Sequence, residues 1–545
     1  MKVMSAWFAL AWSPMVALGQ PAGMPLPILR AVAFDATAVQ QDDERREQAG
    51  ELPLYGRKLA LAVSSADGTW SVDGSERVCR LAVSSPGALA MELFLEDVSV
   101  PAGARMRITT LDGQELHPYV GMDLPQEVHE YATPLVSGDS WVLEYREPVD
   151  ALQPGRFSLP WLGHAYRDVE AFTDREGNCH VNVACSPERD GWEGPIKATV
   201  RISVVVPQGT GWCTGTLVNN VRQDCAPYIL SAFHCGREST TANFNQYKFY
   251  FNFQYAGCSG GSYSTAQFMT GAQLKAYSND YNPQYQGLGG SDFMLLHTNA
   301  GIPGSFEPYW AGWDATNLST VTADGVCIHH PTGAPKRISS YTQTLTTGHP
   351  MASSGLMSHY KLIWAATEHG WGITEVGSSG SGLFKHMDGT GPVLIGTCTG
   401  NSSGMTCSNH SGWAYFGKMS YHWTNNPNTA NLKLKAWLDP DNTGTTVLGG
   451  SDSPCSSPAG TAEQLRQGQL SAYPNPASGL VTIGQVVGAD ARFTVFNATG
   501  HAVLTGRISD KRPTIDVAGL PNGAYLVRLE SDLPAPESIR LLVMH

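Results

Sequence analysis

Short apolar runs separated by turn residues recur along most of the chain, and they predict β-strands rather than helices. In the first third, strand-like runs occupy residues 88–95, 105–111 and 141–145. Residues 20–176 are therefore expected to form a β-sandwich of their own. The charged segment Arg167–Glu176 at its end is of the exposed, polar kind in which proteolytic cleavage is tolerated.

Strand-like runs continue between residues 177 and 447, for example at Ile196–Val206 and Lys248–Phe253. Glycine, tryptophan and cysteine become more frequent in this part of the chain. Residues Thr429–Leu438 predict a closing helix before Asp439-Pro440. Two packed β-barrels followed by a terminal helix would account for a region of this length.

A change in composition marks the last part of the chain. Residues 448–470 are rich in Gly, Ser, Pro and Gln, which predicts a linker. Alternating strands resume at 492–496, 514–517 and 524–529, with turn residues between them. The pattern thus predicts an all-β protein that ends in a small β-sandwich over residues 471–545.

Composition and charge narrow the functional classes. A chain of 545 residues is expected to hold about two to four domains. Its formal net charge of -13 argues against a nucleic-acid partner, which requires a basic surface. Residues 1–19 have the basic start, apolar centre and small closing residues of a signal peptide. Because no later run approaches about 18 apolar residues, the mature chain is expected outside the cell or attached to its surface, without a transmembrane span.

The 11 cysteines point to disulfide bonds in an exported protein. Nine of them lie between Cys179 and Cys407, which marks the region that needs covalent cross-links most. Their spacing contains no Cys-x-x-Cys pair, so no zinc site is expected. The odd total leaves at least one thiol free, removed or joined to another molecule.

Three residues that carry chemistry occur in the order His, Asp, Ser. His234 precedes a cysteine, Asp292 opens an apolar run, and Ser379 lies within the glycine-rich run Gly377–Gly382. A serine hydroxyl is a weak nucleophile, so acyl transfer requires a histidine to take its proton and a carboxylate to orient that histidine. We therefore assign Ser379 as nucleophile, His234 as general base and acid, and Asp292 as the orienting carboxylate.

The glycines beside Ser379 have a separate use. A tight turn aims the N–H groups of Gly377 and Ser379 at one point, which predicts an oxyanion hole. Each of these features alone has a structural explanation: a flexible loop, a buried histidine or a capping aspartate. Their combination in this order favours the chemical interpretation.

These motifs resemble those of the bacterial lysyl endopeptidases, a secreted branch of the chymotrypsin-like serine proteases. The resemblance extends from Asn178 to about Val447. The matching segments are Cys179–Cys185, Cys213–Asn220, Ser291–Leu296, Trp310–Asp314, Ile328–Pro331, Lys336–Ser339, Gly372–Glu375 and Gly377–Ser381. It implies a protease domain over residues 177–447 with a double β-barrel, no metal or cofactor, and activation by removal of a propeptide at residues 20–176.

The resemblance also implies three disulfides, Cys179 with Cys407, Cys185 with Cys258, and Cys213 with Cys235. Cys225, Cys327 and Cys398 are additional and stay unpaired at this stage, as does Cys455. The adjacent His329 and His330 would point to opposite faces of a strand and could not readily chelate one metal. A structural turn is the better interpretation of this pair.

The side-chain specificity departs from the family pattern. Lysine specificity in the family depends on an aspartate whose place is taken here by Ala414, and the other trypsin-like position is Ile373. A buried cation without a countercharge is costly. We expect a pocket formed by Thr399, Gly400, Ala414 and Trp364 for small or apolar side chains, with Lys or Arg cleavage through an unlocated acidic residue as the alternative.

The last domain resembles the C-terminal sorting domain of type IX secretion substrates. The resemblance rests on Tyr473–Pro476, Gly500, Ile515–Val517, Leu520–Tyr525 and Arg528. It implies the outer-membrane secretion machinery as a partner, beside protein or peptide substrates. A secreted serine endopeptidase made as a zymogen is thus the expected function. A catalytically silent, surface-displayed binding protein on a protease fold is the alternative.

Overall fold

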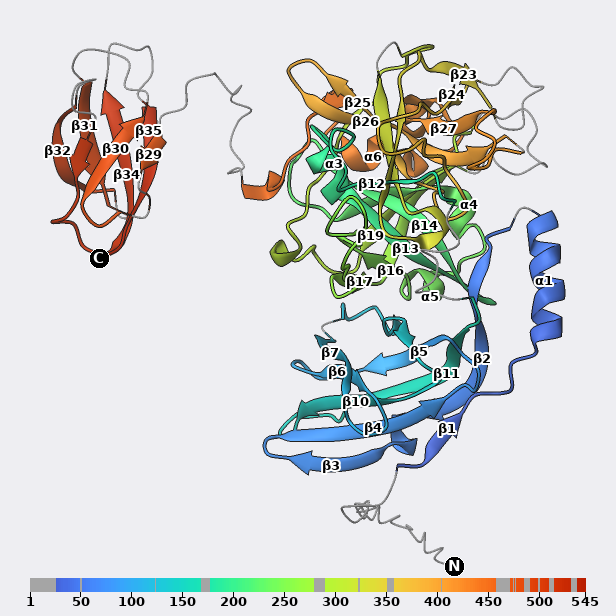
Figure 1. Cartoon of the computed structure of the whole chain (residues 1–545). Coiled ribbons are helices and arrows are strands. Elements are labelled where there is room, and N and C mark those ends of the chain that lie inside the picture. Colours follow the sequence, from blue (N-terminus) through green and yellow to red (C-terminus); the bar gives the residue numbers. More distant parts are fainter. Residues whose placement is uncertain are drawn as a thin grey trace, which may run out of the picture. The chain divides into compact units, whose positions relative to one another are not determined.

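The computed structural model describes residues 26–49, 51–122, 124–167, 177–278, 290–321, 324–349, 357–402, 404–456, 471–473, 475, 477–484, 491–497, 500–508, 514–530 and 537–545. Two compact units divide between Ser457 and Pro458 (Figure 1). The expected signal peptide, residues 1–19, lies outside the described residues. So do residues 168–176, where processing is expected, and 457–470 of the expected linker.

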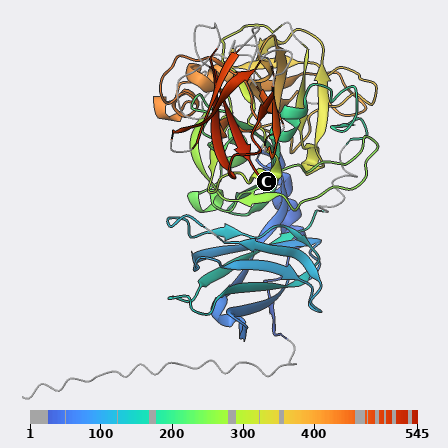
Figure 2. The ribbon, with the colours of Figure 1, turned by 90° about the vertical axis from the view of Figure 1, so that its left-hand side faces the viewer.

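The N-terminal region consists of strands in two layers, in agreement with the expected sandwich (Figures 1 and 2). One sheet has the order β1-β4-β10-β6-β7, with β3 paired to β4, and the other contains β2, β11, β5, β8 and β9. Apolar side chains of both layers form one core, which includes Leu81, Leu93, Tyr145 and Leu159. The strands are β1 (Ile28–Arg30), β2 (Leu54–Ser64), β3 (Thr69–Asp73), β4 (Glu76–Ser84), β5 (Ala90–Ser99), β6 (Arg105–Thr109), β7 (Glu115–Gly121), β8 (Tyr131–Ala132), β9 (Val136–Ser137), β10 (Ser140–Pro148) and β11 (Arg156–Ala165).

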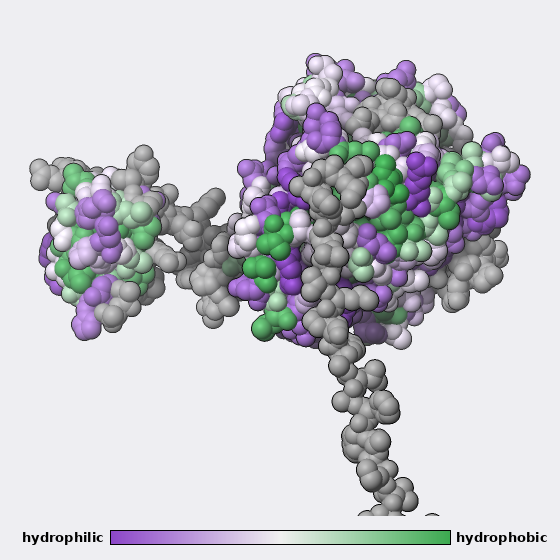
Figure 3. Space-filling view, turned by 90° about the horizontal axis from the view of Figure 1, so that it is seen from below, coloured by the Kyte–Doolittle hydropathy of each residue, from purple (hydrophilic) through white to green (hydrophobic). Residues whose placement is uncertain are grey.

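Outside this core, the surface is mixed. In the view from below, hydrophobic residues lie among hydrophilic ones (Figure 3). One helix, α1 (Ala36–Gln48), was not expected from the sequence, because its residues are almost all polar and show no apolar stripe. It begins where the carboxylate of Asp35 accepts the backbone N–H of Ala38. Near its end, the buried Arg46 forms an ion pair with Glu238, 3.1 Å apart.

The N-terminal region joins the following domain through main-chain pairing. Strand β2 pairs with β14 (Gly209–Val218) around Thr210, so that one sheet of 12 strands runs through both parts. Two buried contacts accompany this pairing. Tyr55 stacks on Trp212 with ring centroids 4.3 Å apart, and Lys248 forms an ion pair with Glu92. Extended backbone of this region therefore occupies an edge of the next domain.

The first barrel of the central domain surrounds a core that includes Ile202, Leu217, Phe249 and Met294. Strand β14 pairs with β13 and β15, and β15 continues through β19 to β18. The elements are α3 (Glu193–Ala198), β13 (Thr199–Val206), β14, β15 (Tyr228–Ser231), α4 (Phe233–Gly236), α5 (Thr241–Phe244), β16 (Lys248–Tyr250), β17 (Phe268–Thr270), β18 (Ala272–Ser278) and β19 (Phe293–Thr298).

The second barrel is a sheet of 10 strands with its own core, which includes Leu383, Ile395 and Phe416. A third apolar cluster lies between the two barrels and contains Leu230 from the first barrel and Ile328 from the second. The strands are β12 (Val181–Asn182), β20 (Gly312–Asp314), β21 (Gly325–His329), β22 (Arg337–Tyr341), β23 (Thr346–Gly348), β24 (His359–Leu362), β25 (Gly382–Met387), β26 (Gly391–Asn401), β27 (Ala414–Lys418) and β28 (Val447–Leu448). Short helical turns are η3 (Gly304–Phe306), η4 (Pro331–Gly333), η5 (Tyr421–Asn425), η6 (Ala430–Leu432), α6 (Lys435–Leu438) and η7 (Pro454–Ser456).

Two expectations for the end of this domain need correction. The single helix expected at Thr429–Leu438 is broken into η6 and α6, because Lys433 is extended and directs the N–H of the buried Leu434 to the carbonyl of His422. The linker expected from residue 448 begins later. Residues up to 456 are held on the domain by β28, by the bridge between Trp310 and Ser451, and by a disulfide between Cys225 and Cys455.

The C-terminal unit is a small two-sheet sandwich, as the sequence predicts for residues 471–545. Its sheets have the orders β29-β30-β33 and β32-β31-β34-β35, and they enclose a core that includes Val481, Val495 and Val527. The strands are β29 (Ser471–Tyr473), β30 (Leu480–Gly484), β31 (Ala491–Phe496), β32 (Ala502–Ile508), β33 (Thr514–Asp516), β34 (Gly523–Glu530) and β35 (Glu537–Val543).

Candidate active site

His234 lies on α4 and Asp292 directly precedes β19, so both residues belong to the first barrel. The Asp292 carboxylate accepts the backbone N–H of His234 at 2.9 Å, and its other oxygen lies 2.7 Å from His234 Nδ1. Asp292 is buried, whereas the His234 side chain is 15% exposed. This arrangement fixes the imidazole with Nδ1 toward the carboxylate and leaves Nε2 for another partner.

The neighbours of His234 in the sequence explain why it is held in place. Phe233 stacks on Tyr277 with centroids 4.5 Å apart, and Cys235 forms a disulfide with Cys213 on β14. Both flanking residues of His234 are therefore anchored in the barrel, one by packing and one covalently.

Asp292 has a support of its own. Its backbone lies in the left-handed region, at φ 53°, which aspartate tolerates better than most residues. The preceding Ser291 is bonded through its hydroxyl to His422 Nδ1 at 2.7 Å, and His422 Nε2 lies 3.0 Å from Thr397 Oγ1. Burial lowers the pKa of His422 to about 3, so this imidazole is neutral and bridges the two hydroxyls.

Thr214 ties the loop of Ser379 to the same barrel. Its N–H donates to the carbonyl of Ser379 at 2.8 Å, and its hydroxyl donates to the carbonyl of Gly377 at 2.8 Å. Because Thr214 adjoins Cys213, the disulfide to Cys235 connects this strand to the neighbour of His234. The sequence-predicted Ser379, Gly377 and His234 thus meet around one segment of β14.

The amides of the Ser379 loop differ in whether they have a hydrogen-bond acceptor. Gly377 has φ 89°, and a Cβ there would lie 2.8 Å from the carbonyl oxygen of His330, so only glycine fits. The N–H groups of Ser378 and Gly380 donate to Glu375 and Cys398, respectively. Within the described part of the chain, the N–H groups of Gly377 and Ser379 have no acceptor. These are the two donors that an oxyanion hole would require.

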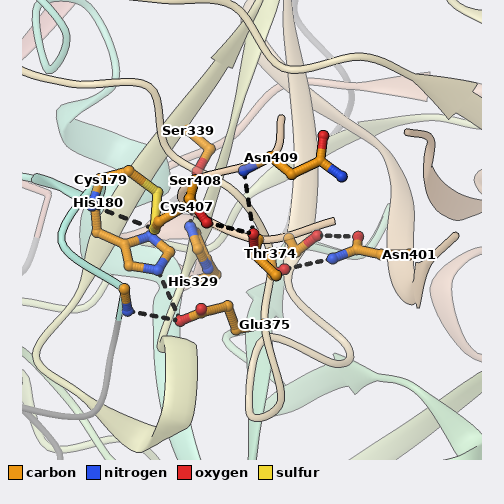
Figure 4. Close-up of a disulfide and its surroundings, with 12 residues drawn as sticks. Cys179, His180, His329, Ser339, Thr374, Glu375, Asn401, Cys407, Ser408 and Asn409 are labelled. Carbon is orange, nitrogen blue, oxygen red and sulfur yellow. Dashed lines mark hydrogen bonds and ion pairs between the residues drawn. A yellow bond between two sulfur atoms is a disulfide. The ribbon is translucent and has the colours of Figure 1, made fainter. Parts of the chain in front are cut away.

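Glu375 closes the turn that precedes Ser379. Its carboxylate lies 2.9 Å from His180 Nε2 and accepts the N–H of Gly177 at 3.2 Å, next to the disulfide of Cys179 (Figure 4). Burial raises the pKa of Glu375, but the contacts with His180 and Gly177 outweigh it, so the pKa lies below its usual value. The start of the central domain therefore stabilises the turn beside the candidate nucleophile.

The four residues of the expected pocket fall into two groups. Trp364 and Ala414 belong to the buried core of the second barrel. Thr399 and Gly400 lie at the end of β26, where Cys398 exchanges backbone hydrogen bonds with Gly380 and Ser381. Only the second pair therefore adjoins the Ser379 loop through described contacts.

The cysteines follow the pattern that the family resemblance implies. The structure contains the disulfides Cys179–Cys407, Cys185–Cys258 and Cys213–Cys235, and in addition Cys225–Cys455. Cys79, Cys327 and Cys398 are buried thiols, so the odd total reflects free cysteines. His329 bonds to the hydroxyls of Ser378 and Ser339, whereas His330 bonds to the carbonyl of Ala334. The two imidazoles therefore have separate structural partners.

Sequence reasoning missed the residues that support the site. Thr214, His422 and Glu375 form hydrogen bonds with residues that are 25 to 195 positions away in the sequence. Thr214 and Glu375 occur within segments that resemble the family, which is the one signal that could have singled them out.

Comparisons with known proteins show which families this chain resembles. Residues 173–417 match the protein family described as lysyl endopeptidase, C-terminal domain, and residues 471–537 match the secretion system C-terminal sorting domain. A lysyl endopeptidase of Pseudomonas aeruginosa is 27% identical over 361 residues, which are 61% of this chain and 72% of that protein.

Solved structures of serine proteases are also similar. The thermostable serine protease AL20 from an extremophilic microorganism is 14% identical with a TM-score of 0.28, covering 42% of this chain and 93% of that one. The protease Anisep from Arthrobacter nicotinovorans is 17% identical with a TM-score of 0.28, covering 42% and 92%.

The all-β, double-barrel fold and the match of residues 173–417 to the lysyl endopeptidase family model indicate a serine endopeptidase. More particularly, the chain is similar to lysyl endopeptidases over residues 173–417 and to the secretion system C-terminal sorting domain over residues 471–537. No helix in the described residues is long and apolar enough to cross a membrane.

Proposed function

We propose that the chain hydrolyses peptide bonds through Ser379, His234 and Asp292, with an acyl-enzyme intermediate. The observation that carries this proposal is the Asp292 carboxylate 2.7 Å from His234 Nδ1, beside a loop that Thr214 ties to the same barrel. Protonation of Nδ1 leaves Nε2 as a base for the Ser379 hydroxyl. The same Nε2 then returns the proton to the leaving amine.

The transition state requires a second feature. When Ser379 Oγ attacks the carbonyl carbon, negative charge develops on the carbonyl oxygen. The N–H groups of Gly377 and Ser379 would donate hydrogen bonds to this oxygen, and their lack of another acceptor among the described residues supports this role. Removing one such donor typically lowers the rate by about 10²–10³-fold.

We further propose that the enzyme is exported and made as a zymogen. Residues 20–176 would be the propeptide, which pairs with β14 through β2, three positions from Thr214 at its nearest. Cleavage between Thr173 and Asn178 would separate it from the enzyme. The sorting domain would direct passage through the outer-membrane machinery, followed by release or attachment at the cell surface.

A serine-reactive fluorophosphonate tests the proposal directly. The exported, processed protein should be labelled at Ser379 and should degrade casein, whereas Ser379→Ala should show neither property. A wild-type protein that is folded but not labelled would instead be the silent binding protein. Labelling that survives Ser379→Ala would place the nucleophile elsewhere.

A further inference from the structure

The second barrel buries a group of basic side chains close to the site. His349, His359, His422 and Lys418 are each at most 4% exposed. The rings of His349 and His359 are in edge contact, with centroids 4.9 Å apart. Lys418 is the cationic member of this group, and its charge opposes a positive charge on His359. This environment repels an added positive charge and is complementary to a negative one.

His359 belongs to a series of hydrogen bonds that leads to Thr399 on β26. The Ser358 hydroxyl lies 2.9 Å from His359 Nδ1, and His359 Nε2 lies 3.0 Å from the hydroxyl of Thr399. When Nδ1 accepts from Ser358, Nε2 donates to Thr399 Oγ1. The hydroxyl hydrogen of Thr399 is then directed to an acceptor other than His359.

Thr399 is placed beside the reacting residue. The carbonyl of the preceding Cys398 accepts the N–H of Gly380 at 2.8 Å, and its N–H donates to the carbonyl of Ser381 at 2.9 Å, the two residues that follow Ser379. The pairing of β26 with β27 shifts between Cys398 and Gly400, so Thr399 has no cross-strand partner there. A Cβ on Gly400 would meet no atom within 4 Å, which leaves open space next to Thr399.

These observations exclude the two other types of pocket. A lysine side chain would meet His359 and its basic neighbours, and no Asp or Glu occurs between Gly389 and Lys418. Asp292, the acidic group that acts on His349, is already bonded to His234. For an apolar side chain, Trp364 and Ala414 are packed into the core and offer no surface.

We propose that the enzyme cleaves after acidic residues, and that the carboxylate of the substrate side chain accepts the Thr399 hydroxyl with His359 behind it. This inference rests on the proposed endopeptidase function. Thr399 and His359 are then specificity-determining residues rather than members of the reacting triad.

The binding of a carboxylate also couples to protons. Burial holds the pKa of His359 well below its ordinary value, and the charge of Lys418 acts in the same direction. A bound carboxylate opposes these effects and favours the imidazolium. Lowering the pH from about 8 to about 6 should therefore strengthen the preference for an acidic over a neutral side chain.

The test uses the exported full chain after its processing and five quenched peptides that differ only in the residue before the scissile bond: Glu, Asp, Gln, Ala or Lys. We expect kcat/KM for Glu to exceed that for Gln by about 10-fold or more, as for a hydrogen bond to a charged group. Because the same reacting residues act on both substrates, effects of pH on the reaction itself cancel in this ratio. It should rise as the pH is lowered.

Three variants assign the preference to residues. Thr399→Val removes the hydroxyl at nearly constant shape and should bring the Glu to Gln ratio close to one, whereas the matched control Thr399→Ser should keep it. His359→Gln should make the ratio independent of pH. Fluorophosphonate labelling of each variant verifies that the site has formed.

The outcomes separate the two proposals. A labelled enzyme that prefers Lys, Gln or Ala, or that cleaves none of the five peptides, overturns the acidic specificity but not the endopeptidase. An unchanged ratio in labelled Thr399→Val overturns the role of Thr399. A wild-type protein with neither labelling nor hydrolysis overturns the endopeptidase, and the inference with it.

Discussion

Replacing Asp292 by Asn tests the orientation of His234 with little change in shape. The backbone of Asp292 is left-handed, and Asn tolerates that conformation equally well. The carboxylate now accepts two N–H groups of His234, at 2.9 and 2.7 Å. The amide has one oxygen, so either a buried N–H faces an NH₂ group or the imidazole adopts the other tautomer. In that tautomer Nε2 carries the hydrogen and no longer accepts the proton of Ser379.

The expected loss can be estimated in two steps. Loss of a charge-assisted hydrogen bond corresponds to about 2–3 kcal/mol, or roughly 30- to 150-fold in rate. The wrong tautomer adds to this, and the same exchange in a Ser-His-Asp triad lowers kcat about 10⁴-fold. We therefore expect a decrease of about 10³–10⁴-fold in fluorophosphonate labelling rate and in kcat on casein.

A matched control is available at a second buried aspartate. Asp314 lies 2.7 Å from Lys385 Nζ, on β20, and has no contact with the triad. Asp314→Asn should destabilise the protein by about 3–5 kcal/mol, because it leaves a buried cation unpaired, without changing the labelling rate of the folded fraction. A labelling rate of Asp292→Asn within tenfold of the wild type would refute the assignment of Asp292 as the orienting carboxylate.

Three further predictions concern the support of the site. Thr214→Val keeps the shape but removes the hydroxyl bond to the Ser379 loop, so we expect the labelling rate to fall at least about tenfold, with the disulfide pattern in peptide mapping unchanged. The folded pKa of Glu375 lies below its ordinary 4.5, so its contribution to stability is present above that pH and is lost as pH falls through the lower folded value. Glu375→Gln should therefore lower the melting temperature near neutral pH and leave it unchanged in strong acid; a loss of equal size at both pH values would contradict this. Burial raises the pKa of Cys79 and Cys398 to about 12 and holds that of Cys327 well above its ordinary value, so a thiol reagent should modify none of them in the native full chain and all three in denaturant. Removal of residues 20–176 should reduce the count in denaturant to two, and rapid reaction of the native protein would refute the burial of these thiols.

The strands could be predicted because alternation is a local property. Residues 90–95 of the run 88–95 lie in β5 and the run 141–145 lies within β10, with mostly buried side chains. Helix α1 could not be found in this way, since it is held by Asp35 at its start and by the ion pair of Arg46 near its end rather than by an apolar face. The helix over Thr429–Leu438 failed for the opposite reason, because tertiary packing of Leu434 overrides local helix propensity.

The same contrast between local sequence motifs and long-range contacts applies to the candidate site. His234, Asp292 and Ser379 stand in short motifs that identify them one by one. The contacts of Thr214 with Gly377, and of His422 with Ser291, depend on how the chain returns to itself, and a single sequence does not encode them visibly. The hydrogen bond of the buried His359 to Thr399 was missed for the same reason.

The disulfide between Cys225 and Cys455 determines which cuts can separate the two units. A nick in the backbone before residue 455 would leave the sorting domain covalently attached to the enzyme through sulfur. Scission beyond residue 455 would free it at once. A protein nicked at residue 450 would thus migrate as one species until a reductant is added, and only maturation downstream of Cys455 would yield a diffusible enzyme.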